Sequence, residues 1–123
     1  MTEQSFLQEI DPNPLVTALV EKTKAGKLIW QPTASPETFI ASVGGETTLQ
    51  LMTETDEEFN EYGEPERITV PVLSMADAKG RQLWQIRSRE VSGSLWPLYR
   101  LGQRVANKVD ERVAALLEAV QSL

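Results

Sequence analysis

The chain has 123 residues and a net charge of −6, from 12 basic and 18 acidic side chains, and it contains neither cysteine nor histidine. These absences exclude disulfides, thiolate nucleophiles, metal sites built on cysteine or histidine, and triads that need a histidine. The length fits a single domain, residues 1–123, with one hydrophobic core. No apolar run approaches the roughly 20 residues that cross a membrane, and residues 1–10 lack the basic side chains of a targeting signal, so we expect a cytoplasmic location.

Charge is distributed unevenly along the chain. Residues 1–66 contain 13 acidic and 3 basic side chains, whereas residues 67–123 contain 5 acidic and 9 basic ones. These opposite charges can pair with each other within the domain, or they can leave a positive face for a partner. An overall acidic chain is a poor candidate for nonspecific binding to nucleic acid.

The first part of the chain predicts helices. Residues 1–12 are expected to form an N-terminal arm or a short helix that begins near Thr2. The next helix is predicted over 14–25, because Asn13 is a suitable N-cap and Gly26 suits the left-handed position after the last turn. Five side chains inside it repeat at helical spacing: Leu15, Val16, Leu19, Val20 and Thr23.

The middle of the chain predicts strands. Residues 27–30 form a short extended stretch that Pro32 ends, and Gly44-Gly45 marks a hairpin. Pro71 cannot donate a hydrogen bond to a neighbouring strand, so one side of its strand should face an edge. Alternating apolar residues predict four strands, and seven acidic side chains between the second and third predict an acidic connecting loop. The strands are 38–43, 47–53, 67–75 and 82–88, and the loop is 54–66.

The end of the chain predicts one long helix. Its apolar residues follow at intervals of three or four: Leu98, Leu101, Val105, Val109, Val113, Leu116, Val120 and Leu123. We expect a rod of roughly 40 Å, in which Gly102 allows a close approach to the sheet. The order of elements predicts an α+β domain: an N-terminal helix, a four-stranded antiparallel meander, and a long C-terminal helix packed on one face.

The second half of that helix is the first candidate surface. A strand of seven residues spans only about 23 Å, so the sheet cannot cover the whole rod. The remaining apolar side chains need cover either from the helix over 14–25 or from another chain, most simply in a two-fold dimer. The candidate interface residues are Val109, Val113, Leu116, Leu117 and Val120.

A set of arginines is the second candidate surface. Alternating arginines should share one face of the last strand, while others recur every four residues along the last helix. Such a set can bind an anion or a partner, can bind single-stranded nucleic acid where aromatic side chains lie beside it, or can pair with the acidic half of the chain. Trp84 points to the opposite face of its strand, which weakens the nucleic-acid interpretation. The candidate residues are Arg81, Arg87, Arg89, Arg100 and Arg104.

The acidic loop is the third candidate. Carboxylates are the ligands that Mg²⁺ and Ca²⁺ prefer, and a pair of them can act as general acid and base. The spacing does not match an EF-hand, however, and a run of like charge is typical of a solvated loop. The weak metal candidates are Asp56, Glu57, Glu58 and Glu61, and the sequence indicates neither a catalytic residue nor a cofactor.

The joint between the first helix and the first extended stretch carries a resemblance. Residues 19–30 follow the pattern Leu-x-x-Lys-Thr-x-x-Gly-Lys-Leu-x-Trp, which resembles a set of small bacterial proteins with no assigned activity. The resemblance covers these twelve residues and, beyond them, only the order of elements, so it implies no catalytic residue. Physically, Gly26 ends the helix and Trp30 anchors the entering chain in the core.

These features together predict a non-enzymatic protein-interaction module that binds a protein partner or forms a homodimer. The alternative is a binder or hydrolase of a small molecule or anion that uses the acidic loop with a divalent metal. We expect neither nucleic acid nor a membrane as the partner.

Overall fold

The computed structural model describes residues 10–123, so the expected helix near Thr2 lies outside the described residues. The elements follow in the order α2 (Asn13–Lys24), β1 (Gln31–Pro32), β2 (Phe39–Val43), β3 (Thr47–Phe59), β4 (Pro65–Ala76), β5 (Gln82–Arg87), the 3-10 helix η1 (Ser88–Glu90), α3 (Trp96–Ala106) and α4 (Val109–Gln121). The predicted α+β class with an antiparallel sheet is confirmed.

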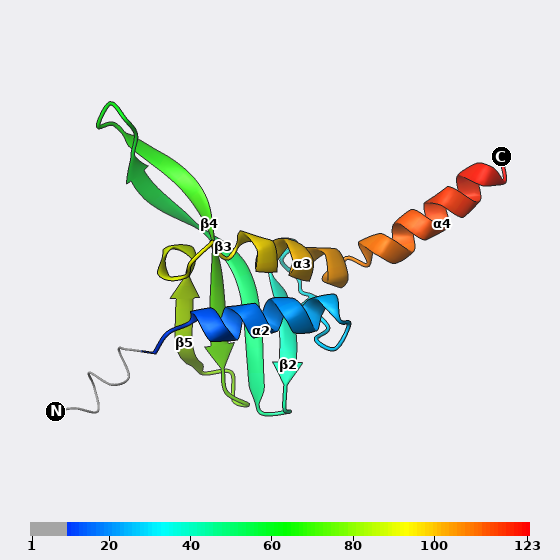
Figure 1. Cartoon of the computed structure of the whole chain (residues 1–123), viewed down its shortest axis with the longest axis horizontal. Helices are drawn as coiled ribbons and strands as arrows, with labels where there is room; N and C mark the ends of the chain where they lie inside the picture. Colours follow the sequence, from blue (N-terminus) through cyan, green and yellow to red (C-terminus); the bar gives the residue numbers. More distant parts are fainter. Residues whose placement is uncertain (1–9) are drawn as a thin grey trace.

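The sheet is a meander of five strands in the order β1-β2-β3-β4-β5, one strand more than predicted. The additional strand, β1, directly follows the extended stretch 27–30 and pairs Gln31 with Ile40. α2 and α3 lie side by side across one face of the sheet (Figure 1). The core is therefore a single layer between these two helices and the sheet.

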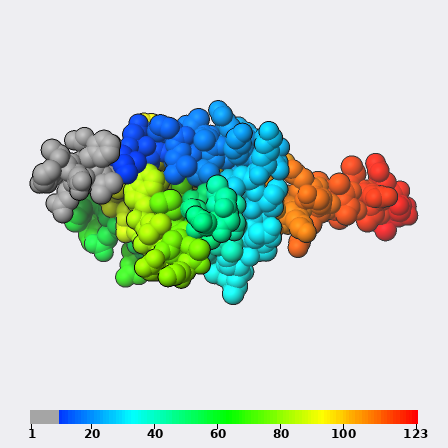
Figure 2. All heavy atoms as spheres, turned by 90° about the horizontal axis from the view of Figure 1, so that it is seen from below, coloured from blue at the N-terminus to red at the C-terminus, as the bar shows by residue number. Residues whose placement is uncertain are grey.

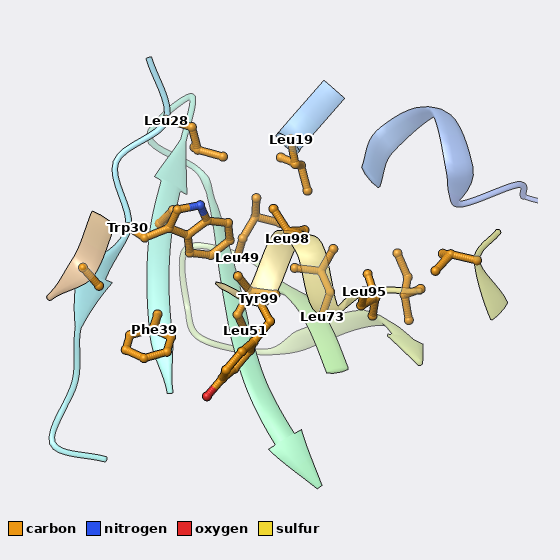
Figure 3. Packing of buried hydrophobic residues seen from close by; sticks show 14 residues of the cluster. Leu19, Leu28, Trp30, Phe39, Leu49, Leu51, Leu73, Leu95, Leu98 and Tyr99 are labelled. Atoms are coloured by element: carbon orange, nitrogen blue, oxygen red, sulfur yellow. The ribbon is translucent and has the colours of Figure 1, made fainter. Parts of the chain in front are cut away.

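The core is tightest where α3 crosses the centre of the sheet. Gly102 permits the close approach, because a Cβ at this position would lie 2.8 Å from Leu51 Cδ1. Trp30 is buried, and its indole N–H donates a hydrogen bond to Thr23 Oγ1 at 3.0 Å. This bond ties the chain that leaves α2 back to the helix. Figure 3 shows the packed cluster, which includes Leu19, Leu28, Phe39, Leu49, Leu73, Leu95, Leu98 and Tyr99.

The two ends of α2 differ in how well they were predicted. Gly26 has a φ of 74° and follows the C-cap residue Ala25, as expected for the left-handed position. Asn13 is not the N-cap but the first residue of the helix. Its side-chain oxygen instead accepts a hydrogen bond from the backbone N–H of Ser92 at 2.8 Å. This contact joins the start of α2 to the loop that precedes α3.

The predicted acidic loop over 54–66 is wrong, because most of it is strand. β3 continues to Phe59 and β4 begins at Pro65, so the connection is a short turn. Glu54, Asp56, Glu58 and Glu66 share one face of the hairpin and Glu57 lies on the other, an arrangement that an extended backbone accommodates. We call residues 53–59 and 65–71 the β3–β4 arm. Among the described strands they pair only with each other, and they project from the body in Figure 1.

The predicted single C-terminal helix is also wrong. α3 ends at Ala106 and α4 begins at Val109. Lys108 lies between them with a φ of 52°, a left-handed conformation that ends a right-handed helix, and its N–H donates to the carbonyl of Val105 at 3.1 Å. The break directs α4 away from the sheet, so of the two C-terminal helices α3 alone packs on it. Figures 1 and 2 show α4 as a rod that leaves the body.

Candidate interaction surfaces

α4 exposes all of the predicted interface residues. The exposed fractions are 37% for Val109, 57% for Val113, 63% for Leu116, 57% for Leu117, 53% for Val120 and 102% for Leu123. We call these six side chains the α4 stripe; their spacing places them along one side of the helix. Of the two sources of cover expected from the sequence, α2 does not supply it, because α2 packs against α3.

α4 is fastened to the body near its first turn. The guanidinium of Arg104 on α3 binds the Asp110 carboxylate with N–O distances of 2.7 Å. A shallow hollow of about 380 Å³ lies beside this ion pair, and Ile29, Leu101 and Val105 form its apolar lining. The rest of α4 extends beyond these contacts, so its stripe faces solvent.

The five candidate arginines do not form one face. Arg87 lies on the sheet face opposite the helices, because its strand partner Val72 alternates with the core residue Leu73, whereas Arg100 and Arg104 belong to α3. Each arginine has an interaction inside the chain: Arg81 with Asp77 at 2.8 Å, Arg87 with Glu54 at 3.0 Å, Arg89 with Asp56 at 3.2 Å, Arg104 with Asp110 at 2.7 Å, and Arg100 with the Trp96 ring at 5.6 Å. Pairing with the acidic half therefore accounts for Arg87 and Arg89.

The tip of the β3–β4 arm is an exposed surface that the sequence analysis did not single out. Phe59 is 74% exposed and Tyr62 is 79% exposed. The turn that carries Tyr62 is ordered by Asn60, whose side-chain oxygen accepts the N–H groups of Tyr62 and Glu64 at 2.9 and 3.1 Å. The only available signal was the Asn-x-x-Gly pattern at 60–63, which is typical of a tight turn.

The four weak metal candidates do not converge. Glu57 points to the opposite face of β3 from Asp56 and Glu58, because side chains alternate along a strand. Glu61 lies in the turn, and Asp56 already pairs with Arg89. Within residues 10–123, no three acidic, histidine or cysteine side chains are placed so that they could hold one metal ion. The metal-dependent alternative therefore has no ligand set in this range.

Within residues 10–123, the titratable groups with shifted pKa values are Tyr99 and Asp77, and both have a structural role. Burial raises the pKa of Tyr99, with a smaller contribution from the charge of Glu37, and the Tyr99 hydroxyl donates to the Glu37 carbonyl at 2.6 Å. The backbone N–H of Arg81 donates to Asp77 and lowers the pKa of that carboxyl group. Tyr99 thus fastens α3 to the loop before β2, and Asp77 closes the turn between β4 and β5.

Comparison of the chain with protein-family models, with curated proteins and with solved structures found no match. The helices of residues 10–123 include none with the length and apolar character that a membrane span requires.

Proposed function

We propose that this chain is a protein-interaction module and that it binds through the α4 stripe. The observation that supports this most strongly is the exposure of five large apolar side chains on α4 and of Leu123 just beyond its end, with values from 37% to 102%. Contiguous apolar surface of this kind is uncommon on monomeric proteins and marks sites of association.

The length of α4 also supports a bound state. α4 has 13 residues, and an isolated helix of that length is only marginally stable in water. Most helices gain their stability from packing of an apolar face, yet no residue of α4 is buried. A partner on the stripe would supply the packing that the body does not.

A protein fits the stripe better than a membrane surface does. Helices that lie on anionic membranes carry lysine and arginine on the polar face. The charged residues of α4 are three acids, Asp110, Glu111 and Glu118, and one base, Arg112. This polar face would be repelled by an anionic lipid surface rather than attracted to it.

Site-specific photo-cross-linking in the expressing cell tests this proposal. A benzophenone amino acid that replaces Leu116 should cross-link to protein, because that side chain lies in the stripe. The matched control replaces Glu118, which projects from the opposite side of the same helix and should give several-fold less product. Equal yields at the two positions, or no product at Leu116, would refute binding through the stripe.

A further inference from the structure

We infer that the occupant of the α4 stripe is a second copy of this chain, with the two α4 helices packed antiparallel about a two-fold axis. This inference rests on the proposed function and adds the identity and orientation of the partner. It follows from the spacing of the stripe, from the placement of charge around it, and from the position of the acidic arm.

The spacing of the stripe is self-complementary. Five of the six stripe residues, all but Leu117, follow from Val109 to Leu123 in alternating steps of four and three, which is the a/d pattern of a coiled coil. Val113 and Val120 take the a positions, and the d positions belong to Val109, Leu116 and Leu123. A two-fold interface uses the same patch on both subunits, so a single a/d stripe can provide both halves.

The charges of α4 leave the stripe free to pair with itself. Glu111 and Glu118 fall at f positions, on the side of the helix away from the a/d seam. Asp110 lies nearer to the stripe, but its carboxylate is engaged by Arg104 at 2.7 Å. Two copies can therefore approach along the stripe without bringing acidic side chains face to face.

The distribution of charge over the whole molecule favours the antiparallel orientation. Residues 54–66 contain seven acids and no base, a net charge of −7, whereas residues 96–123 contain four bases and three acids, a net charge of +1. Figure 1 shows the β3–β4 arm and α4 at opposite ends of the molecule. Antiparallel helices join the two nearly neutral ends and keep the acidic arms as far apart as possible. A parallel pair would place both arms at the same end, where they would repel each other.

The size of the stripe sets the expected affinity. A stable interface usually buries about 800 Å² on each partner, and one 13-residue helix offers less than that. We therefore expect a reversible dimer with a Kd on the order of 10 µM. The association should be visible over concentrations from about 1 to 300 µM.

Sedimentation equilibrium of the purified chain tests whether the partner is a second copy. The native chain should shift from monomer to dimer over this range, and Leu116→Glu with Val120→Glu should remain monomeric. The control, Ala115→Glu with Ser122→Glu, adds the same charge on the other side of α4 and should dimerise like the native chain. A native chain that is monomeric throughout, or a dimer that survives the stripe variant, would overturn the inference.

The orientation of the two helices can be tested with spin labels on introduced cysteines, because the chain has no cysteine of its own that would also be labelled. Spin labels attached at Glu111→Cys in one copy and Gln121→Cys in the other should lie closer together than two labels at Gln121→Cys. A parallel dimer would reverse this order and contradict the antiparallel assignment. These outcomes are distinct from a failure of the proposed function. If the pure chain is monomeric but Leu116 cross-links to a different protein, the proposed function stands and the inference of a second copy is refuted.

Discussion

α3 and α4 share one apolar repeat in the sequence but have opposite environments in the structure. In α3 the repeat packs on the core, where Leu98 is 0% exposed and Leu101 and Val105 are half-buried, whereas in α4 Leu116 is 63% exposed. Periodicity therefore predicts that a helix has an apolar face, but it does not show what covers that face. Here one left-handed residue, Lys108, separates a helix that builds the core from a helix whose apolar face is exposed.

The largest expected difference between the helices is the cost of removing a leucine. Leu98→Ala should lower the free energy of unfolding by about 3 kcal/mol, because it leaves a cavity in the core. Leu116→Ala should change the stability of the monomer by less than about 0.5 kcal/mol, since that side chain is already largely solvated. Urea denaturation at about 1 µM protein, where the monomer dominates, measures both. Equal losses would show that α4 packs on the body and would abolish the contrast.

Gly102 allows a second test of the tight packing of α3. Gly102→Ala should destabilise the fold by about 1–3 kcal/mol, although alanine favours a helix, because the new Cβ would meet Leu51 at 2.8 Å. The control, Ala115→Gly in α4, should lower helical content without moving the main unfolding transition. Thermal unfolding followed by tryptophan fluorescence separates the two effects. A stabilising Gly102→Ala would show that α3 lies farther from the sheet.

Lys108 can be altered to test the break between the helices. Lys108→Gly should stabilise the chain by up to about 1 kcal/mol, because glycine adopts the positive φ of 52° without strain. The gain is limited by the greater freedom of glycine in the unfolded chain. Chemical denaturation gives the value. A loss of more than 1 kcal/mol would indicate that the helices form one continuous rod in solution.

The smallest expected effect concerns the β3–β4 arm, the other exposed extension of the molecule. Glu58 lies directly opposite Glu66 in the strand pairing, and like charges in that position repel. Glu58→Gln should raise stability by less than about 1 kcal/mol, and 1 M salt should remove the difference because it screens the repulsion. The melting temperatures of the variant and the native chain at low and high salt measure this difference in stability. A variant that melts lower than the native chain at low salt would contradict the repulsion.

The sequence predicted correctly those elements that carry a clear local signal, such as a capping glycine or an alternation of apolar residues. Gly26 marks the end of α2, and β2 lies within one residue of its predicted start because its alternating residues are unambiguous. The arm was missed because charged residues hid the alternation of an extended hairpin. The break at Lys108 was missed because lysine has no particular preference for positive φ, and the apolar spacing continues across it.

For the candidate surfaces, too, the features set by local spacing were predicted and those set by tertiary packing were not. All five predicted residues of the α4 interface are exposed on one helix, because spacing alone fixes which side chains share a face. The five arginines do not form the single surface that was predicted, because the face on which each one lies depends on how the strands and helices pack against one another. Pairing of Arg87 with Glu54 joins residues 33 positions apart, which no local pattern could specify.

Amide hydrogen exchange at two protein concentrations tests the central claim most directly. At about 1 µM, α3 should be strongly protected and α4 weakly protected, because only α3 is packed. At about 300 µM, protection of α4 should rise by at least tenfold while that of α3 stays constant, since association covers the stripe. Protection of α4 that does not depend on concentration would contradict the claim that a second copy covers this helix.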